Sequence, residues 1–161
     1  MISATITGLP EMRAALASIP SKLRRRALRN ALNAGARIVR DAARMNRRTS
    51  SAGSPMTGTM LRNYQRGTVA KAINVRTSKI ATRAGDVGVF VNVRPLKRGV
   101  AGRHNPSDPF YWRFLEWGTK YMTARPFLTP AASKLTEALT KFTQVLGPQI
   151  EKLNVNPKDT L

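Results

Sequence analysis

Aromatic side chains are concentrated in one short stretch of this chain of 161 residues. Seven of its ten aromatic residues lie between Phe110 and Phe127. Aromatic side chains dominate the energetics of protein cores and of protein interfaces. Because the chain has so few of them, this stretch is predicted to hold either the centre of the fold or the centre of a protein–protein contact.

The rest of the composition is that of a globular chain with a large excess of positive charge. Hydrophobic residues make up 42% of the sequence, which argues against wholesale disorder. The net charge is +20, of which residues 1–50 carry +9, residues 51–108 carry +8 and residues 109–161 carry +3. Such a charge favours a nucleic acid, an acidic protein or an anionic surface as partner. The aromatic stretch lies in the least charged third.

The first third of the chain has the spacing of helices. Weak alternation over residues 3–7 predicts a short strand, and apolar residues from Leu9 to Ile19 then predict a short helix. Pro20 opens a longer predicted helix over residues 20–46, with an apolar stripe along one face.

Arginines are predicted to form a row on the opposite face of that long helix. The row consists of Arg26, Arg29, Arg37, Arg40, Arg44 and Arg47, with Arg48 beside it. A row of this kind is either a solvated face or a surface that contacts phosphates or acidic protein groups, and arginine suits bidentate binding of oxyanions.

The remaining segments predict a loop, strands and two further helices. Composition predicts loops over 46–59 and 97–109 and strands between residues 60 and 94. Residues 72–75 are one candidate strand, and the alternating valines over residues 87–93 form the clearest one.

The aromatic stretch and the residues after it predict a helix, an extended segment and a second helix. The first helix covers 110–117 and ends at Gly118 in a left-handed conformation. The extended segment covers residues 121–128. The second helix has Thr129 as N-cap and Pro130 as first residue, and it ends at Gly147-Pro148.

These elements predict an α+β fold in which N-terminal helices and a long C-terminal helix pack on a small, mainly antiparallel sheet. We expect residues 1–153 to form a single domain and residues 154–161 to form a mobile tail.

Motifs for catalysis, cofactors or metals do not stand out. His104 is the only histidine, and with Ser107 and Asp108 it lies within five residues of one loop, too close to orient a catalytic triad. One histidine and no cysteine disfavour a transition-metal site, and no phosphate-binding glycine loop is present. We therefore expect no enzyme activity, no catalytic residue and no cofactor.

Glu116 is the one acidic residue that the sequence singles out, because it lies among aromatic residues. A carboxylate there must be solvated or paired. Two interpretations remain open. Glu116 forms an ion pair with Arg113 or Arg125 that fixes the Gly118 turn, or it forms a salt bridge to another subunit.

The same segment carries a resemblance to a known family. Glu116, Trp117, Gly118 and Thr119 match a hydrophobic–Glu–aromatic–Gly–Thr pattern, and Pro126, Phe127, Pro130 and Ala131 match a Pro-Phe-x-x-Pro-Ala pattern that opens a C-terminal helix. Trp112 and Arg125 lie in the same block. Upstream, Thr57-Gly58 and Leu61-Arg62 resemble a further segment of the pattern, with Pro55 one position out of register.

This pattern resembles the gene-product-ten-like tail-component family. These are head–tail joining or tail-completion proteins of long-tailed lambdoid phages of the HK-ninety-seven type. The resemblance implies a structural virion protein of the phage neck, made in the host cytoplasm, that forms a ring around the DNA channel, with six-fold symmetry expected. Its implied partners are further copies of itself and the adjacent neck and tail proteins, namely the head-completion or stopper protein and the tail terminator or tail tube. The arginine row would then contact packaged DNA without reading its sequence, or dock on an acidic ring above or below, and both alternatives are open. No membrane contact is expected.

A free nucleic-acid-binding protein, either ribosomal-like or architectural, is the competing interpretation. The high positive charge supports it. The clustering of the aromatic residues argues against it, since a platform for single strands needs aromatic and basic residues interleaved.

Overall fold

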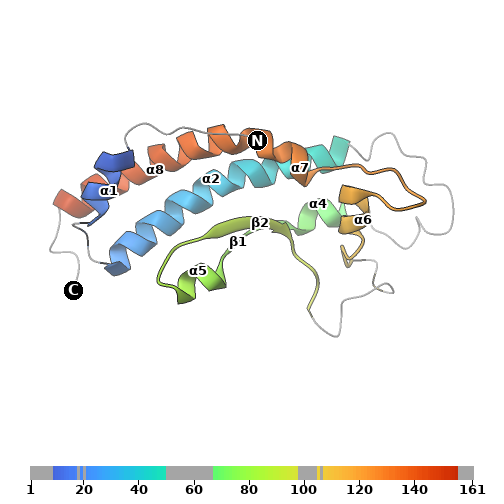
Figure 1. The fold of residues 1–161 in the computed structure, drawn as a ribbon, viewed down its shortest axis with the longest axis horizontal. Coiled ribbons are helices and arrows are strands. Elements are labelled where there is room, and N and C mark those ends of the chain that lie inside the picture. The colour runs from blue at the N-terminus through green and yellow to red at the C-terminus, as the bar shows by residue number, and fades with distance from the viewer. Residues whose placement is uncertain are drawn as a thin grey trace. The chain divides into compact units, whose positions relative to one another are not determined.

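The computed structural model describes residues 9–17, 19, 21–49, 67–97, 105 and 107–155 (Figure 1). In chain order the elements are α1 (Leu9–Ala17), α2 (Ser21–Thr49), α4 (Thr68–Ala72), β1 (Ile73–Thr77), α5 (Lys79–Arg83), β2 (Val89–Val93), α6 (Trp112–Trp117), α7 (Leu128–Ala131), the short 3₁₀ helix η1 (Ala132–Lys134) and α8 (Leu135–Val155). Strands β1 and β2 pair as a two-stranded antiparallel sheet. The predicted α+β class, with a long C-terminal helix and a small antiparallel sheet, is confirmed.

Some sequence predictions fall outside the described residues. These are the strand at 3–7, the loop from residue 50 to 59, the basic loop around His104, the side chain of Arg48 and the tail from residue 156 onward. Within the described residues, no helix is both long enough and apolar enough to cross a membrane.

The chain divides into two compact units, each assembled from separate parts of the sequence. The first unit contains residues 1–38, 75–90 and 134–161, and the second contains residues 39–74 and 91–133. The expected single domain over residues 1–153 stays a prediction.

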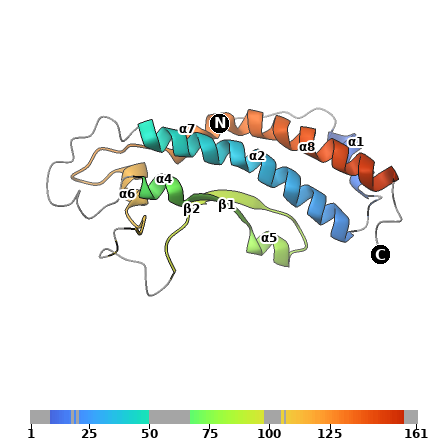
Figure 2. The same cartoon turned by 180° about the vertical axis from the view of Figure 1, so that it is seen from behind.

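The core of the first unit lies among the N-terminal helices and α8. Its buried residues are Ile19, Ala27, Ala31, Leu146 and Ile150. The part of α2 that belongs to this unit, residues 21–38, lies beside α8 in both views (Figures 1 and 2). Gly35 allows this approach, because a Cβ atom at this position would lie 2.5 Å from the carbonyl oxygen of Ala138.

The core of the second unit gathers residues from six helices and strands and from the segment before α7. Its buried residues are Ala43, Val69, Ile73, Val93, Leu115, Phe127 and Ala131. Phe127 is the largest of the side chains that are almost completely buried. Tyr111 and Trp112 pack against this core as half-buried neighbours, so part of the aromatic stretch is core material.

Two short helices form where the sequence predicted strands only. Helix α4 precedes β1 because it buries Val69 and Ala70 in the second unit, and this burial outweighs the strand preference of the segment. Helix α5 follows β1, and the hydroxyl of Ser78 caps it by accepting a hydrogen bond from the amide of Ala81 at 3.3 Å.

Helix α8 also differs from its prediction, because it continues through Gly147-Pro148 to Val155. A proline inside a helix removes one hydrogen bond and is unfavourable. Here Ile150 is buried and Leu153 packs beside it in the core of the first unit, so burial beyond the proline favours the continued helix.

Replacement of Gly35 by alanine tests the close approach of α2 and α8. The added Cβ would meet backbone at 2.5 Å, and we expect Gly35→Ala to lower the free energy of unfolding by about 1–3 kcal/mol. Asn30→Ala, at an exposed position of the same helix, is the control and should stabilise slightly through helix propensity. Urea denaturation measures both. Stabilisation by Gly35→Ala would show that the two helices do not approach each other at this residue.

Candidate functional site

The two halves of the Glu–Trp–Gly–Thr and Arg–Pro–Phe–Leu–Thr motif lie together in the second unit. After α6 the chain makes a tight turn in which Thr119 and Met122 exchange backbone hydrogen bonds, of 2.9 and 3.2 Å. The amide of Arg125 then donates to the carbonyl of Leu115 at 2.7 Å. The chain therefore folds back on α6 and carries residues 127–129 to the side chain of Glu116.

Gly118 makes this reversal possible. Its φ is 75° and its ψ is −177°, a region of backbone space that is almost restricted to glycine. The predicted positive φ is confirmed, but the ψ is extended and not that of a left-handed helix. The amide of Gly118 still closes α6 by donating to the carbonyl of Phe114 at 2.9 Å. A Cβ here would also lie 2.8 Å from the amide nitrogen of Ala124.

The carboxylate of Glu116 caps the start of α7. One oxygen, Oε2, accepts hydrogen bonds from the amides of Phe127 at 2.8 Å and Leu128 at 3.0 Å. The other, Oε1, accepts from the amide of Thr129 at 2.8 Å and from its hydroxyl at 2.7 Å. We call this arrangement of one carboxylate and four donors the Glu116 latch.

The latch corrects two sequence predictions. Neither Arg113 nor Arg125 is among the hydrogen-bond partners that the described residues provide to Glu116; amides and a hydroxyl take that place. The N-cap of α7 is Phe127, with no side-chain cap of its own, so Thr129 and Pro130 lie in the first turn. The physical reason is that the first amides of a helix need acceptors, and here a carboxylate from another helix supplies them in place of the Thr129 side chain.

Burial and hydrogen bonding act in opposite directions on the carboxyl group. Glu116 is 4% exposed, and burial alone would raise its pKa, but the hydrogen bonds from Leu128, Phe127 and Thr129 together lower the pKa below its ordinary value. Glu116 is therefore a carboxylate at neutral pH, with charge-assisted hydrogen bonds holding the motif together.

Two side chains of α2 make further hydrogen bonds within the second unit. The amide side chain of Asn46, on α2, donates to the carbonyl of Phe127 at 3.3 Å. The guanidinium of Arg44 donates to the carbonyl of Ile73 through Nε at 3.1 Å and through Nη2 at 2.8 Å. Ile73 is the C-cap residue that follows α4, and a cation suits the free carbonyls at a helix C-terminus.

Three aromatic side chains that neighbour the latch in the sequence are exposed. Phe114 is 49% exposed, Trp117 is 67% exposed and Tyr121 is 91% exposed. We call these three residues the aromatic face. The rings of Trp117 and Trp112 lie 5.7 Å apart, the guanidinium of Arg113 lies 5.5 Å from the Trp112 ring, and the ammonium of Lys120 lies 5.9 Å from the Tyr121 ring.

The predicted arginine row is not continuous on the surface. Arg26, Arg29 and Arg37 are exposed. Arg40 pairs with Asp41 at 2.9 Å, and Arg44 binds the carbonyl of Ile73. Arg47 is half-buried, and burial is the main cause that lowers its pKa. The row is interrupted because the second half of α2 belongs to the second unit, and the helix face that carries Arg44 and Arg47 also takes part in its packing.

The other motif residues divide between support and surface. Phe127 is fully buried, Trp112 and Arg125 are half-buried, and Thr119, Pro126 and Pro130 are exposed. The part of the chain that the structure describes contains no group of three or more histidine, cysteine, aspartate or glutamate residues placed to hold a metal ion.

Comparison with known proteins gives no relative. No protein-family model matches the sequence, and no curated protein and no solved structure matches it either.

Removal of the Glu116 carboxylate should destabilise the second unit. Glu116→Ala leaves several buried donors without an acceptor, and we expect a loss of about 3 kcal/mol in the free energy of unfolding. Glu137→Ala is the control, because that carboxylate is exposed beside Lys134 and its removal should leave the melting temperature nearly unchanged. Equal melting temperatures for the two variants would contradict the latch.

The stabilisation by the latch should depend on pH in a defined direction. The pKa of Glu116 is lower in the folded chain than in the unfolded chain, so its contribution is complete at neutral pH and declines as the pH falls below about 4 toward the folded pKa. The stability difference between the wild type and Glu116→Gln should therefore narrow over that range. Chemical denaturation from pH 7 downward measures it, and a difference that widens on acidification would be inconsistent with a lowered pKa.

Proposed function

We propose that this chain is a non-catalytic structural subunit of a phage neck that assembles into a ring, as its motif resemblance implies. The observation that carries the proposal is the aromatic face. Phe114, Trp117 and Tyr121 expose large apolar side chains beside a rigid latch. Tryptophan and tyrosine are enriched among the residues that dominate binding energy at protein interfaces.

The latch supports the same proposal, because it gives the motif a structural role. The motif holds α6 against the segment that leads into α7, through Glu116, Gly118 and the backbone of Phe127. A motif that fixes local geometry and leaves aromatic rings exposed suits a subunit that presents a preorganised surface to neighbours.

A ring requires contacts that are heterologous, so that one surface of a subunit meets a different surface of the next. In this proposal the aromatic face supplies one of the two surfaces. The exposed arginines Arg26, Arg29 and Arg37 are then available for DNA in the channel or for an acidic neighbouring ring in the virion, and both alternatives stay open.

The alternative function, a free nucleic-acid-binding protein, has less support among the described residues. Arg40 and Arg44 are engaged within the chain, which leaves fewer cations of the row for phosphates. A protein of that class would bind duplex DNA in a salt-sensitive manner and would form no closed ring.

Replacement of the aromatic face tests the proposed assembly. Negative-stain microscopy and sedimentation of the chain, alone and with the adjacent head-completion and tail-tube proteins, should show closed rings. The double variant Trp117→Ala/Tyr121→Ala should reduce ring formation at least tenfold with little change in subunit stability, since both side chains are mostly exposed.

Phe90→Ala is the matched control, because it removes a 41% exposed aromatic side chain from the first unit, and it should leave assembly intact. A monomer that forms no ring in the presence of the neck proteins would refute the proposal. If rings form equally well in the double variant, the aromatic face is not one of the assembly surfaces.

A further inference from the structure

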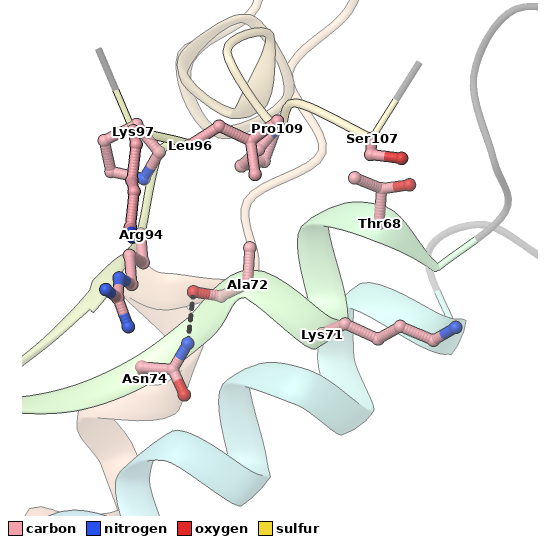
Figure 3. Close-up of a pocket in the computed structure, with 10 residues that line it drawn as sticks. Thr68, Lys71, Ala72, Asn74, Arg94, Leu96, Lys97, Ser107 and Pro109 are labelled. Carbon is pink, nitrogen blue, oxygen red and sulfur yellow. Dashed lines mark hydrogen bonds between the residues drawn. The ribbon is translucent and has the colours of Figure 1, made fainter. Parts of the chain in front are cut away.

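A second surface of the second unit has a chemistry different from that of the aromatic face. A pocket of about 530 Å³ lies between α4 and the segments that flank residues 98–106 of the sequence. Figure 3 shows the side chains that line it. A pocket of this size is in the range that holds a small ligand or a few side chains of a partner.

The rim of this pocket is cationic. Lys71, Arg94 and Lys97 line it, and all three are exposed. Figure 3 shows Lys71 extending from α4 away from Arg94, so the cations border different parts of the pocket. Within the described part of the chain, no salt bridge or side-chain hydrogen bond involves any of the three. Their charges are therefore available to a ligand.

The described residues that line the pocket include no carboxylate. Asp108 is the nearest acidic residue in the sequence, and its side chain is buried and does not line the pocket. The local charge thus selects an anionic occupant.

Part of the pocket lining is apolar, and we call this part the floor. Ala72, Pro95 and Leu96 contribute its aliphatic surface, whereas Pro109 borders the pocket but is almost completely buried. Transfer of this apolar surface from water to an apolar contact is favourable, so the floor favours an occupant that brings an apolar group as well as negative charge.

These two properties exclude other occupants. A second copy of the chain carries a net charge of +20 with only eight acidic residues, so it complements the cationic rim less well than an acidic partner does. Duplex DNA presents phosphates but no apolar group to a concave floor. Single-stranded bases bind by stacking on aromatic side chains, and none of the described lining residues is aromatic.

We infer that this pocket docks an acidic segment of a partner protein, with an aliphatic side chain on the floor at Pro95 and Leu96 and carboxylates at Lys71, Arg94 and Lys97. The inference depends on the pocket alone and does not require ring assembly. Its test on the isolated chain is therefore independent of the proposed function.

Fluorescence anisotropy with labelled synthetic peptides tests the inference. The probe is a short peptide in which aspartates and glutamates flank two leucines, and the matched probe carries serines in place of the leucines. We expect the leucine peptide to bind and the serine peptide to bind several-fold more weakly. The triple variant Lys71→Gln/Arg94→Gln/Lys97→Gln should bind the leucine peptide with about tenfold lower affinity.

The matched control is Arg76→Gln/Lys79→Gln/Arg83→Gln, which removes the same charge from exposed positions of β1 and α5 and should change the affinity less than about twofold. Equal losses in both triple variants, equal binding of both peptides, or no binding of the leucine peptide would each overturn the inference. A short duplex that displaces the peptide and loses affinity only in the pocket variant would identify a nucleic-acid site instead.

Discussion

The contact between one buried carboxylate and the start of a helix determines the arrangement of the second unit. Glu116 accepts four hydrogen bonds from residues 127–129, and the first amides of a helix have no partners within the helix. An unpaired carboxylate and unpaired amides would each be costly when buried. Because each satisfies the other, α6 and α7 are held in register, and Phe127 is kept in the core.

The latch also explains why the aromatic stretch serves two purposes. Residues on one side of α6, such as Leu115 and Trp112, pack against the core, while Phe114 and Trp117 remain on the surface. The turn at Gly118 adds Tyr121 at the tip of a short hairpin. The surface thus carries exposed rings on a backbone that hydrogen bonds constrain, which is the condition under which binding loses least conformational entropy. The proposed assembly role rests on this combination.

The sequence predicted those helices and strands that a periodic pattern of apolar residues marks. Helical spacing predicted α1 and α2, and alternating valines predicted β2, because periodicity reports directly on burial. The partners of Glu116 could not be predicted in this way. The amides that donate to its carboxylate lie eleven to thirteen residues further along the chain, whereas a capping box spans only three residues. The interruption of the arginine row had the same cause: Arg44 meets a carbonyl 29 residues away, which a helical wheel does not contain. One signal was available, namely a lone carboxylate between aromatic residues, which has to find donors.

The central claim is that the carboxylate of Glu116 holds residues 127–129 at the start of α7. Native-state hydrogen exchange of the amides of Phe127, Leu128 and Thr129 measures this most directly, because these are the groups that donate to it. The account predicts slow exchange of all three amides at neutral pH and faster exchange of the same three in Glu116→Gln. Exchange in the wild type as fast as that of an unstructured peptide, or rates that Glu116→Gln leaves unchanged, would contradict it.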